Sequence, residues 1–171
     1  LSQVFTPFYN VWRAKPLPSL PACGEGQPIA VASDPLPRPV GPIMHAPGES
    51  NAWKRATAWL DRVDDYTRTR DVPGVAGTSE VSADLKFGTL SALALVHLIG
   101  EATPGRAAFI RQLAWRDWWA HTLVQRPDLP SAALNPAYAS IAWRDDDAGF
   151  ERWCTGQTGF PIVDAGMRQL V

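Results

Sequence analysis

The chain has few cysteines and no long hydrophobic run. Only Cys23 and Cys154 occur among 171 residues, with no Cys-x-x-Cys pair and no Cys/His cluster. This usage indicates neither a disulfide framework nor a metal site, and favours two ordinary thiols in a reducing cytoplasm. No run of about 18 apolar residues is present, so no membrane-spanning segment is predicted.

The chain also has no excess of charge, with 16 basic residues against 17 acidic ones. A nucleic-acid-binding protein usually shows a basic excess, so the total does not point to that class. However, 13 of the basic residues are arginine and only three are lysine. Arginine suits bidentate phosphate contacts and stacking, so a basic face can exist within a neutral total.

A length of 171 residues fits one domain, and eight tryptophans within 46% hydrophobic residues can form a sizeable core. The first residue is not methionine, and the last residues continue a helical pattern without a cap. We therefore expect part of a longer chain.

The pattern predicts an all-α fold preceded by a connector. Residues 1–14 favour a short helix, whereas residues 15–48 hold nine prolines and four glycines and favour an extended surface connector. From residue 49 the apolar residues recur three and four positions apart. Helices are predicted over 50–70, 82–87, 92–99, 103–125 and 148–154, and from Pro161 to the end. No segment alternates as a β-strand would.

The predicted central helix has two distinct faces. One stripe comprises Ile110, Leu113, Asp117, Ala120 and Val124; the other comprises Gln112, Trp115, Arg116 and Trp119. The second stripe combines an amide, a guanidinium and two indoles, which suits a flat, anionic ligand such as a base or a flavin. The pattern alone favours the simpler interpretation, a core helix with a buried, paired arginine.

Other residues that could take part in binding or catalysis also have simpler structural roles. The loop from Gly77 to Ser82 is rich in hydroxyls and could hold a phosphate, although N-capping by Ser82 and Ser91 is the more usual role. Indoles are normally core residues but also carry single electrons near a redox cofactor. His97 and His121 have no partner for nucleophilic catalysis and are predicted to be structural, and Asp145–Asp147 to be a solvated loop.

Four ordered segments resemble the DNA photolyase/cryptochrome family. They are Trp153–Leu170, with the sequence WCTGQTGFPIVDAGMRQL, and the earlier segments Gly77–Ser82 (GTSEVS), Leu85–Ser91 (LKFGTLS) and Gln112–Asp117 (QLAWRD). Phe5-Thr6-Pro7-Phe8 is similar to the family's entry into its connector. The chain looks most like the class I bacterial photolyases that repair cyclobutane pyrimidine dimers.

The resemblance implies the N-terminal half of a helical FAD-binding domain over 49–171, truncated at its C-terminus, after a connector over 1–48. It further implies that light-excited, reduced FAD splits a flipped-out dimer by electron transfer. The implied cofactor-binding residues are Tyr66, Thr78, Ser79, Glu80, Val81, Ser82 and Arg116. The implied catalytic and DNA-binding residues are Gln112 and Trp115 on the lesion, Arg70 and Trp119 on DNA, and Trp143 as the outermost indole of the photoreduction chain.

Two residues depart from the family pattern. Gln112 stands where many dimer photolyases have glutamate; (6-4) photolyases and cryptochromes tend to have glutamine there. Glu80 stands where a basic or polar residue is usual. Its carboxylate would repel an FAD phosphate unless it points away, which the exposed middle of such a loop allows.

Three functions therefore compete: a photolyase, a cryptochrome-like photoreceptor without repair activity, and a helical interaction module without a cofactor. The first is preferred. Its partner would be UV-damaged DNA, and an antenna pigment of folate or deazaflavin type is expected in an N-terminal domain outside this chain. A cytoplasmic monomer is expected, and this chain alone is expected to be inactive and to bind FAD weakly.

Overall fold

A computed structural model describes most of the chain. The residues it describes are 4–22, 24, 26, 31–32, 35 and 45–170, so that Cys23 and much of the predicted connector lie outside them. The chain divides into two compact units, Leu1–Arg126 and Pro127–Val171.

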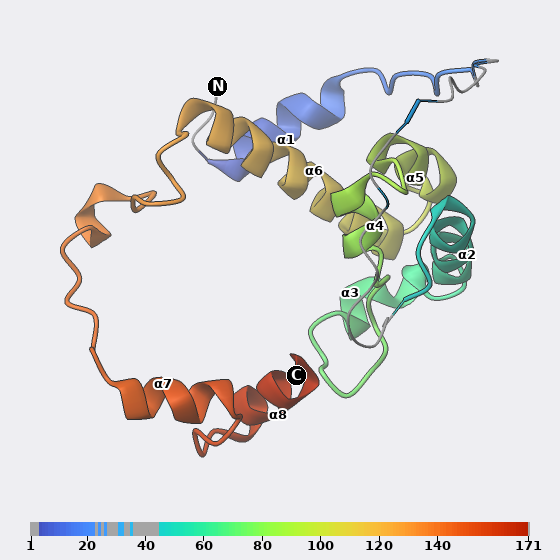
Figure 1. Cartoon of the computed structure of the whole chain (residues 1–171). Helices are drawn as coiled ribbons and strands as arrows, with labels where there is room; N and C mark the ends of the chain where they lie inside the picture. Colours follow the sequence, from blue (N-terminus) through green and yellow to red (C-terminus); the bar gives the residue numbers. More distant parts are fainter. Residues whose placement is uncertain are drawn as a thin grey trace. The chain divides into compact units, whose positions relative to one another are not determined.

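The described residues form helices and no strand, as the sequence predicted (Figure 1). The first unit contains α1 (Phe5–Ala14), α2 (Glu49–Trp59), the 3-10 turn η1 (Val63–Asp65), α3 (Tyr66–Thr69), α4 (Ser82–Phe87), α5 (Ala92–Ile99) and α6 (Pro104–Gln125). The second unit contains the 3-10 turn η2 (Pro136–Tyr138), α7 (Asp147–Cys154) and α8 (Pro161–Leu170).

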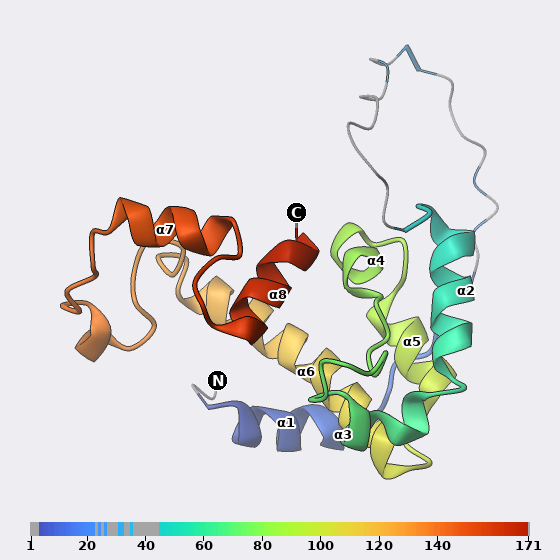
Figure 2. The same ribbon diagram turned by 90° about the horizontal axis from the view of Figure 1, so that it is seen from below.

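The core of the first unit lies between α2, α5 and the first half of α6. Figure 2 shows α5 between the other two helices. Trp59, Leu95 and Ile110 are fully enclosed there, and Ala52 and Ala56 allow α2 to approach closely. Ile110 belongs to the apolar stripe that the three-and-four spacing predicted for the central helix.

Helix α1 packs along α6 (Figure 1). Phe5 is buried in a small aromatic cluster with Ala114 and Trp118. The indole Nε1 of Trp12 donates to Oδ2 of Asp117 at 3.0 Å, which joins the two helices across 105 positions of sequence. The short helix predicted within residues 1–14 is confirmed, and it packs against α6.

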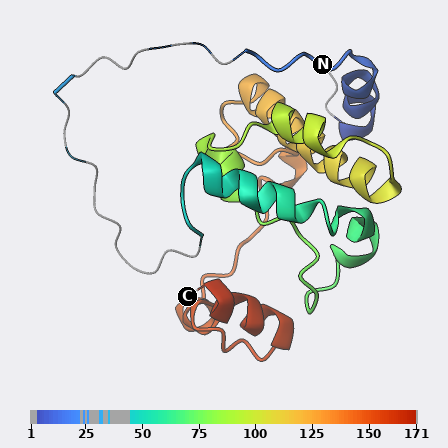
Figure 3. The ribbon, with the colours of Figure 1, turned by 90° about the vertical axis from the view of Figure 1, so that its right-hand side faces the viewer.

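The predicted single helix over 50–70 is wrong, because it is interrupted after Trp59 (Figure 3). The break turns the carbonyls of Val63 and Asp64 toward Gly105, where any side chain would collide with them. The Asp64 carboxylate accepts from Arg106 Nε at 2.8 Å and from Thr103 Oγ1 at 2.6 Å. These contacts anchor the start of α6, and a continuous helix would not supply them.

Helix α6 has its predicted bounds, because Thr103 accepts from the amide of Arg106 and Pro104 occupies the first turn. Its predicted apolar stripe is only partly correct. Ile110 and Leu113 are buried, whereas Val124 is 82% exposed. Trp118 is buried instead, since it packs against α1.

Of the two serines predicted as helix caps, only one caps a helix. Ser91 accepts from the amide of Ala94 and begins α5, as predicted. Ser82 is the first residue of α4 rather than its cap; the capping position is Val81, and no side chain caps this helix. The hydroxyl of Ser82 is therefore not used for the predicted capping role.

In the second unit, α7 and α8 pack together. The predicted acidic loop is partly helical, because Asp146 accepts from the amide of Gly149 at 2.8 Å and begins α7. Within the described part of the chain, no helix has the length and hydropathy needed to cross a bilayer. The same residues include no group of three metal-ligating side chains.

Candidate functional site

A cavity of about 780 Å³ opens in the first unit, between α3, the loop 78–81, α4 and the middle of α6. A volume of this size is within the range of small-molecule sites. It is lined by Tyr66, Thr78, Ser79, Glu80, Val81, Ser82, Leu85, Lys86, Phe109, Gln112, Leu113, Arg116 and Ala120. All seven residues predicted to bind a cofactor, together with Gln112, therefore meet at one cavity.

Tyr66 forms a fixed part of this wall. Its ring packs edge-on against Trp59, with ring centroids 5.7 Å apart, and against Phe109 at 5.4 Å. Burial raises the pKa of the Tyr66 phenol, and the nearby Arg70 guanidinium partly opposes that rise. Tyr66 therefore lines the cavity as a neutral side chain.

The loop before α4 is held closely against α3. A side chain at Gly77 would come within 2.6 Å of the Thr69 carbonyl, so only glycine permits this approach. The guanidinium of Arg62 also donates to the Ala76 carbonyl at 3.1 Å. Thr78 and Ser79, the next residues of this loop, line the same cavity as Tyr66.

Glu80 has an unusual backbone conformation. Its φ of 57° is the only positive value among the described non-glycine residues. A non-glycine residue in this region costs of order 1–3 kcal/mol and is often found in ligand-binding segments. Its side chain is exposed. The carboxylate is therefore solvated at the edge of the cavity.

The opposite wall comes from α6, where Gln112 and Arg116 lie one turn apart. Arg116 Nη2 donates to the Leu85 carbonyl at 3.3 Å and so links α6 to α4. Gln112 is half-buried. Arg116 brings a permanent positive charge to the cavity, which favours an anionic ligand.

Lys86 was not predicted to belong to the site but lines the same cavity. It lies on α4 four positions after Ser82, and Leu85 lies three after it, so the three residues share one face. That spacing was available in the sequence. Lys86 adds a second positive charge to that of Arg116.

Other predicted site residues lie outside the cavity lining. The ring of Trp115 stacks on Phe5 with centroids 3.7 Å apart and planes 7° apart, and it meets Trp118 edge-on at 5.2 Å. Trp119 is half-exposed and packs on Trp118. The second stripe of α6 is thus divided, because Gln112 and Arg116 face the cavity and the two indoles contact aromatic neighbours.

Two further predicted residues are exposed. Arg70 lies over the Tyr66 ring, with its guanidinium carbon 5.7 Å from the centroid, and pairs with Asp71. Trp143 belongs to the second unit and is 85% exposed. Their predicted roles on DNA and in electron transfer stay predictions.

The chain is similar to known DNA photolyases and to a cryptochrome. A family model described as "FAD binding domain of DNA photolyase" matches residues 109–171. Two deoxyribodipyrimidine photo-lyases, from Streptomyces griseus and Escherichia coli, are 38% and 33% identical over 98% of this chain. The chain spans 38% and 39% of their lengths. A Synechocystis cryptochrome structure matches 75% of this chain, at 28% identity and a TM-score of 0.66, over 29% of its own length.

Proposed function

This chain belongs to the DNA photolyase/cryptochrome family, and we propose that it serves in light-driven, FAD-dependent repair of cyclobutane pyrimidine dimers in UV-damaged DNA. The observation that carries the proposal is the single cavity shared by Tyr66, the segment Thr78–Ser82 and Arg116. These residues come from three separate parts of the sequence. Their convergence favours a joint role in binding one ligand.

The donors at the cavity fit FAD. Hydroxyls of Thr78, Ser79 and Ser82 can bond phosphate and ribityl oxygens, and backbone amides of a turn also suit a pyrophosphate. Arg116 and Lys86 balance its negative charge, while Phe109 and Leu113 supply apolar surface. When bound in its reduced form, FAD supplies the light-excited electron that splits the dimer. We propose Arg116 for the flavin end of the cavity.

We propose that Trp115 and Gln112 recognise the flipped lesion. Trp115 would stack on the base after leaving or sharing its contact with Phe5, and the Gln112 amide would bond a thymine carbonyl. An amide lacks the charge and the exchangeable acid proton of a glutamate, so (6-4) photoproducts are the alternative lesion. Arg70 and Trp119, both at the surface, would contact DNA, and Trp143 would carry electrons toward the flavin.

The remaining expectations belong to the same proposal. Residues 1–48 would connect the helical domain, 49–171, to a domain that holds a folate or deazaflavin antenna pigment. The active protein would be a monomer. A cryptochrome-like photoreceptor is the second candidate, and the match to a cryptochrome structure is the observation in its favour.

The test is a repair assay on the full-length protein, purified with flavin and reduced. Blue light should restore an oligonucleotide that carries one cyclobutane dimer, and the same reaction in the dark should not. Repair of a (6-4) photoproduct, without repair of the cyclobutane dimer, would make the (6-4) photoproduct the substrate instead. Flavin binding without reversal of either lesion would favour the photoreceptor, and a full-length protein without flavin would refute both.

A further inference from the structure

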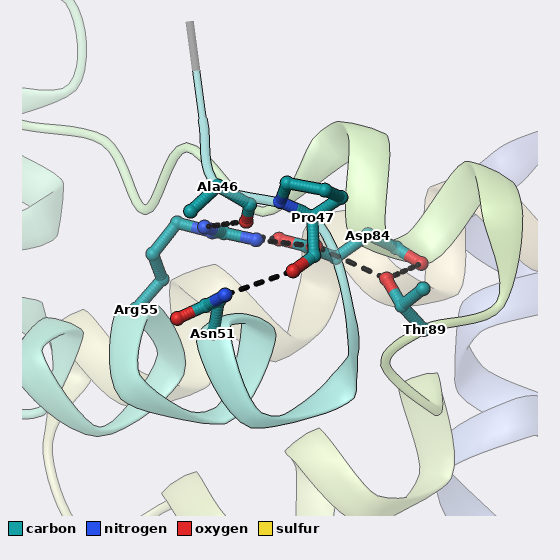
Figure 4. A network of polar contacts seen from close by, with 6 residues as sticks. All are labelled: Ala46, Pro47, Asn51, Arg55, Asp84 and Thr89. Carbon is teal, nitrogen blue, oxygen red and sulfur yellow. Dashed lines mark hydrogen bonds and ion pairs between the residues drawn. The ribbon is translucent and has the colours of Figure 1, made fainter. Parts of the chain in front are cut away.

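A part-buried ion pair lies on the side of α4 away from its cavity-lining residues. Asp84 is only 5% exposed. The Arg55 guanidinium from α2 meets its carboxylate as a fork, with Nε 3.0 Å from Oδ2 and Nη2 2.7 Å from Oδ1 (Figure 4). Paired hydrogen bonds of this kind fix the orientation of both groups as well as their separation.

The pair is part of a larger network. Thr89 Oγ1 donates to the Asp84 carboxylate at 3.1 Å, and the Asp84 carbonyl accepts from the amide of Leu90. Arg55 Nη1 donates to the Ala46 carbonyl at 2.9 Å, and Asn51 donates to the Pro47 carbonyl at 2.8 Å (Figure 4). Arg55 therefore joins three segments: the residues before α2, α2 itself and α4.

Helix α4 depends on such outside contacts. It has six residues and no side-chain cap, and an isolated helix of that length is unstable in water. Ser82, Leu85 and Lys86 on one of its faces line the cavity. Asp84 lies on the opposite side, and its contact with Arg55 pairs α4 with the long, well-packed α2.

We propose that Arg55 and Asp84 are positioning residues of the cofactor site. Their ion pair fixes α4 on α2, and so holds Ser82 and Lys86 at the cavity without touching the ligand. The same guanidinium couples the end of the connector, at Ala46, to this wall. The inference rests on the proposed function, because the ligand is taken to be FAD.

The experiment measures FAD affinity in the full-length protein by fluorescence titration, for wild type, Asp84→Asn, Arg55→Gln and the double variant. We expect each single variant to weaken FAD binding about tenfold, a usual size for coupling through residues that do not contact the ligand. The double variant should be no weaker than the singles, since one interaction is lost in all three. Arg55→Lys keeps the charge without the fork and should recover part of the affinity.

Arg106→Gln is the control, because Arg106 also forms an ion pair across two elements, with the more exposed Asp64, and neither residue lines the cavity. It should lower the melting temperature and leave FAD affinity unchanged. Equal FAD affinity in wild type and all Asp84 and Arg55 variants overturns the inference, as does an equal loss in Arg106→Gln. A wild type that binds no FAD overturns the proposed function instead.

Discussion

Each unit of the chain contains a buried aspartate in a helix, and the two carboxylates are held in different ways. Asp84 in the first unit is bound by a guanidinium from a helix 29 positions away. Asp164 in the second unit, 8% exposed, accepts hydrogen bonds from neutral donors in the loop before α8, and the charge of Arg168 contributes less. These donors are the amide and hydroxyl of Thr158, at 2.7 and 2.6 Å, and the amide of Gly159 at 3.1 Å.

The two carboxylates differ in how far along the sequence their partners lie. Asp164 fixes a turn five or six residues before it, so its effect is local. Asp84 fixes a helix against another helix and, through Arg55, against the residues before α2. Replacement of Asp84 should therefore affect the cavity wall, whereas replacement of Asp164 should affect only the loop before α8.

The largest effect is expected for Asp84→Ala, which leaves the half-buried Arg55 without its carboxylate. Opening of α4 should become easier by roughly 2 kcal/mol, the usual value of hydrogen bonds to a charged group. Hydrogen exchange at the amides of Leu85 and Leu90 measures it, because both bond within this region. Unchanged protection there would mean that the ion pair does not hold α4.

A smaller and local effect is expected for Asp164→Ala. The amides of Thr158 and Gly159 lose their acceptor and should exchange roughly tenfold faster, in line with one lost hydrogen bond. Exchange at Leu85 and Leu90 should not change. A loss of protection in both places would remove the distinction between the two aspartates.

Acid should weaken both regions. The Arg55 hydrogen bonds lower the pKa of Asp84, and the Thr158 hydroxyl lowers that of Asp164. A carboxyl whose folded pKa is depressed stabilises the fold above its unfolded pKa of about 3.9, and this contribution is lost as pH falls through the folded pKa. The free energy of unfolding should therefore stay constant from neutral pH to about 5 and decrease below about pH 4.

Circular dichroism of urea unfolding between pH 2 and 7 measures this dependence. Asp84→Asn cannot ionise at that position, so its profile should be shallower than that of wild type. Identical acid slopes in the two proteins would show that Asp84 is not held as a paired carboxylate.

The smallest effect is expected for Thr89→Val, which removes one donor to Asp84 and leaves the Arg55 fork intact. Opening at Leu90 should become easier by about 1 kcal/mol, the usual net value of one hydrogen bond. Thr158→Val is the matched change at Asp164, where the backbone amides remain as donors. A Thr89→Val effect as large as that of Asp84→Ala would make Thr89, not Arg55, the main partner.

The same difference in range explains what could be predicted from the sequence. The bounds of α6 follow from Thr103 and Pro104, which act on their own neighbours. The break after Trp59 was missed because the residue that its carbonyls approach, Gly105, lies more than 40 residues away. Helical periodicity marks faces but not their partners.

For the candidate site, the sequence predicted the cavity residues but not their distant contacts. Motif resemblance gathered Tyr66, Thr78–Ser82 and Arg116, which converge on one cavity. It gave no sign that Trp115 stacks on Phe5, since the two rings are 110 positions apart. The Arg55–Asp84 pair was missed for the same reason.

The cavity between α3, α4 and α6 is proposed to bind FAD. The most direct measurement is a crystal structure of the full-length protein loaded with FAD. We predict the pyrophosphate within hydrogen-bonding distance of the segment Thr78–Ser82, with Arg116 beside the flavin. FAD bound elsewhere, with this cavity filled only by solvent, would contradict the account.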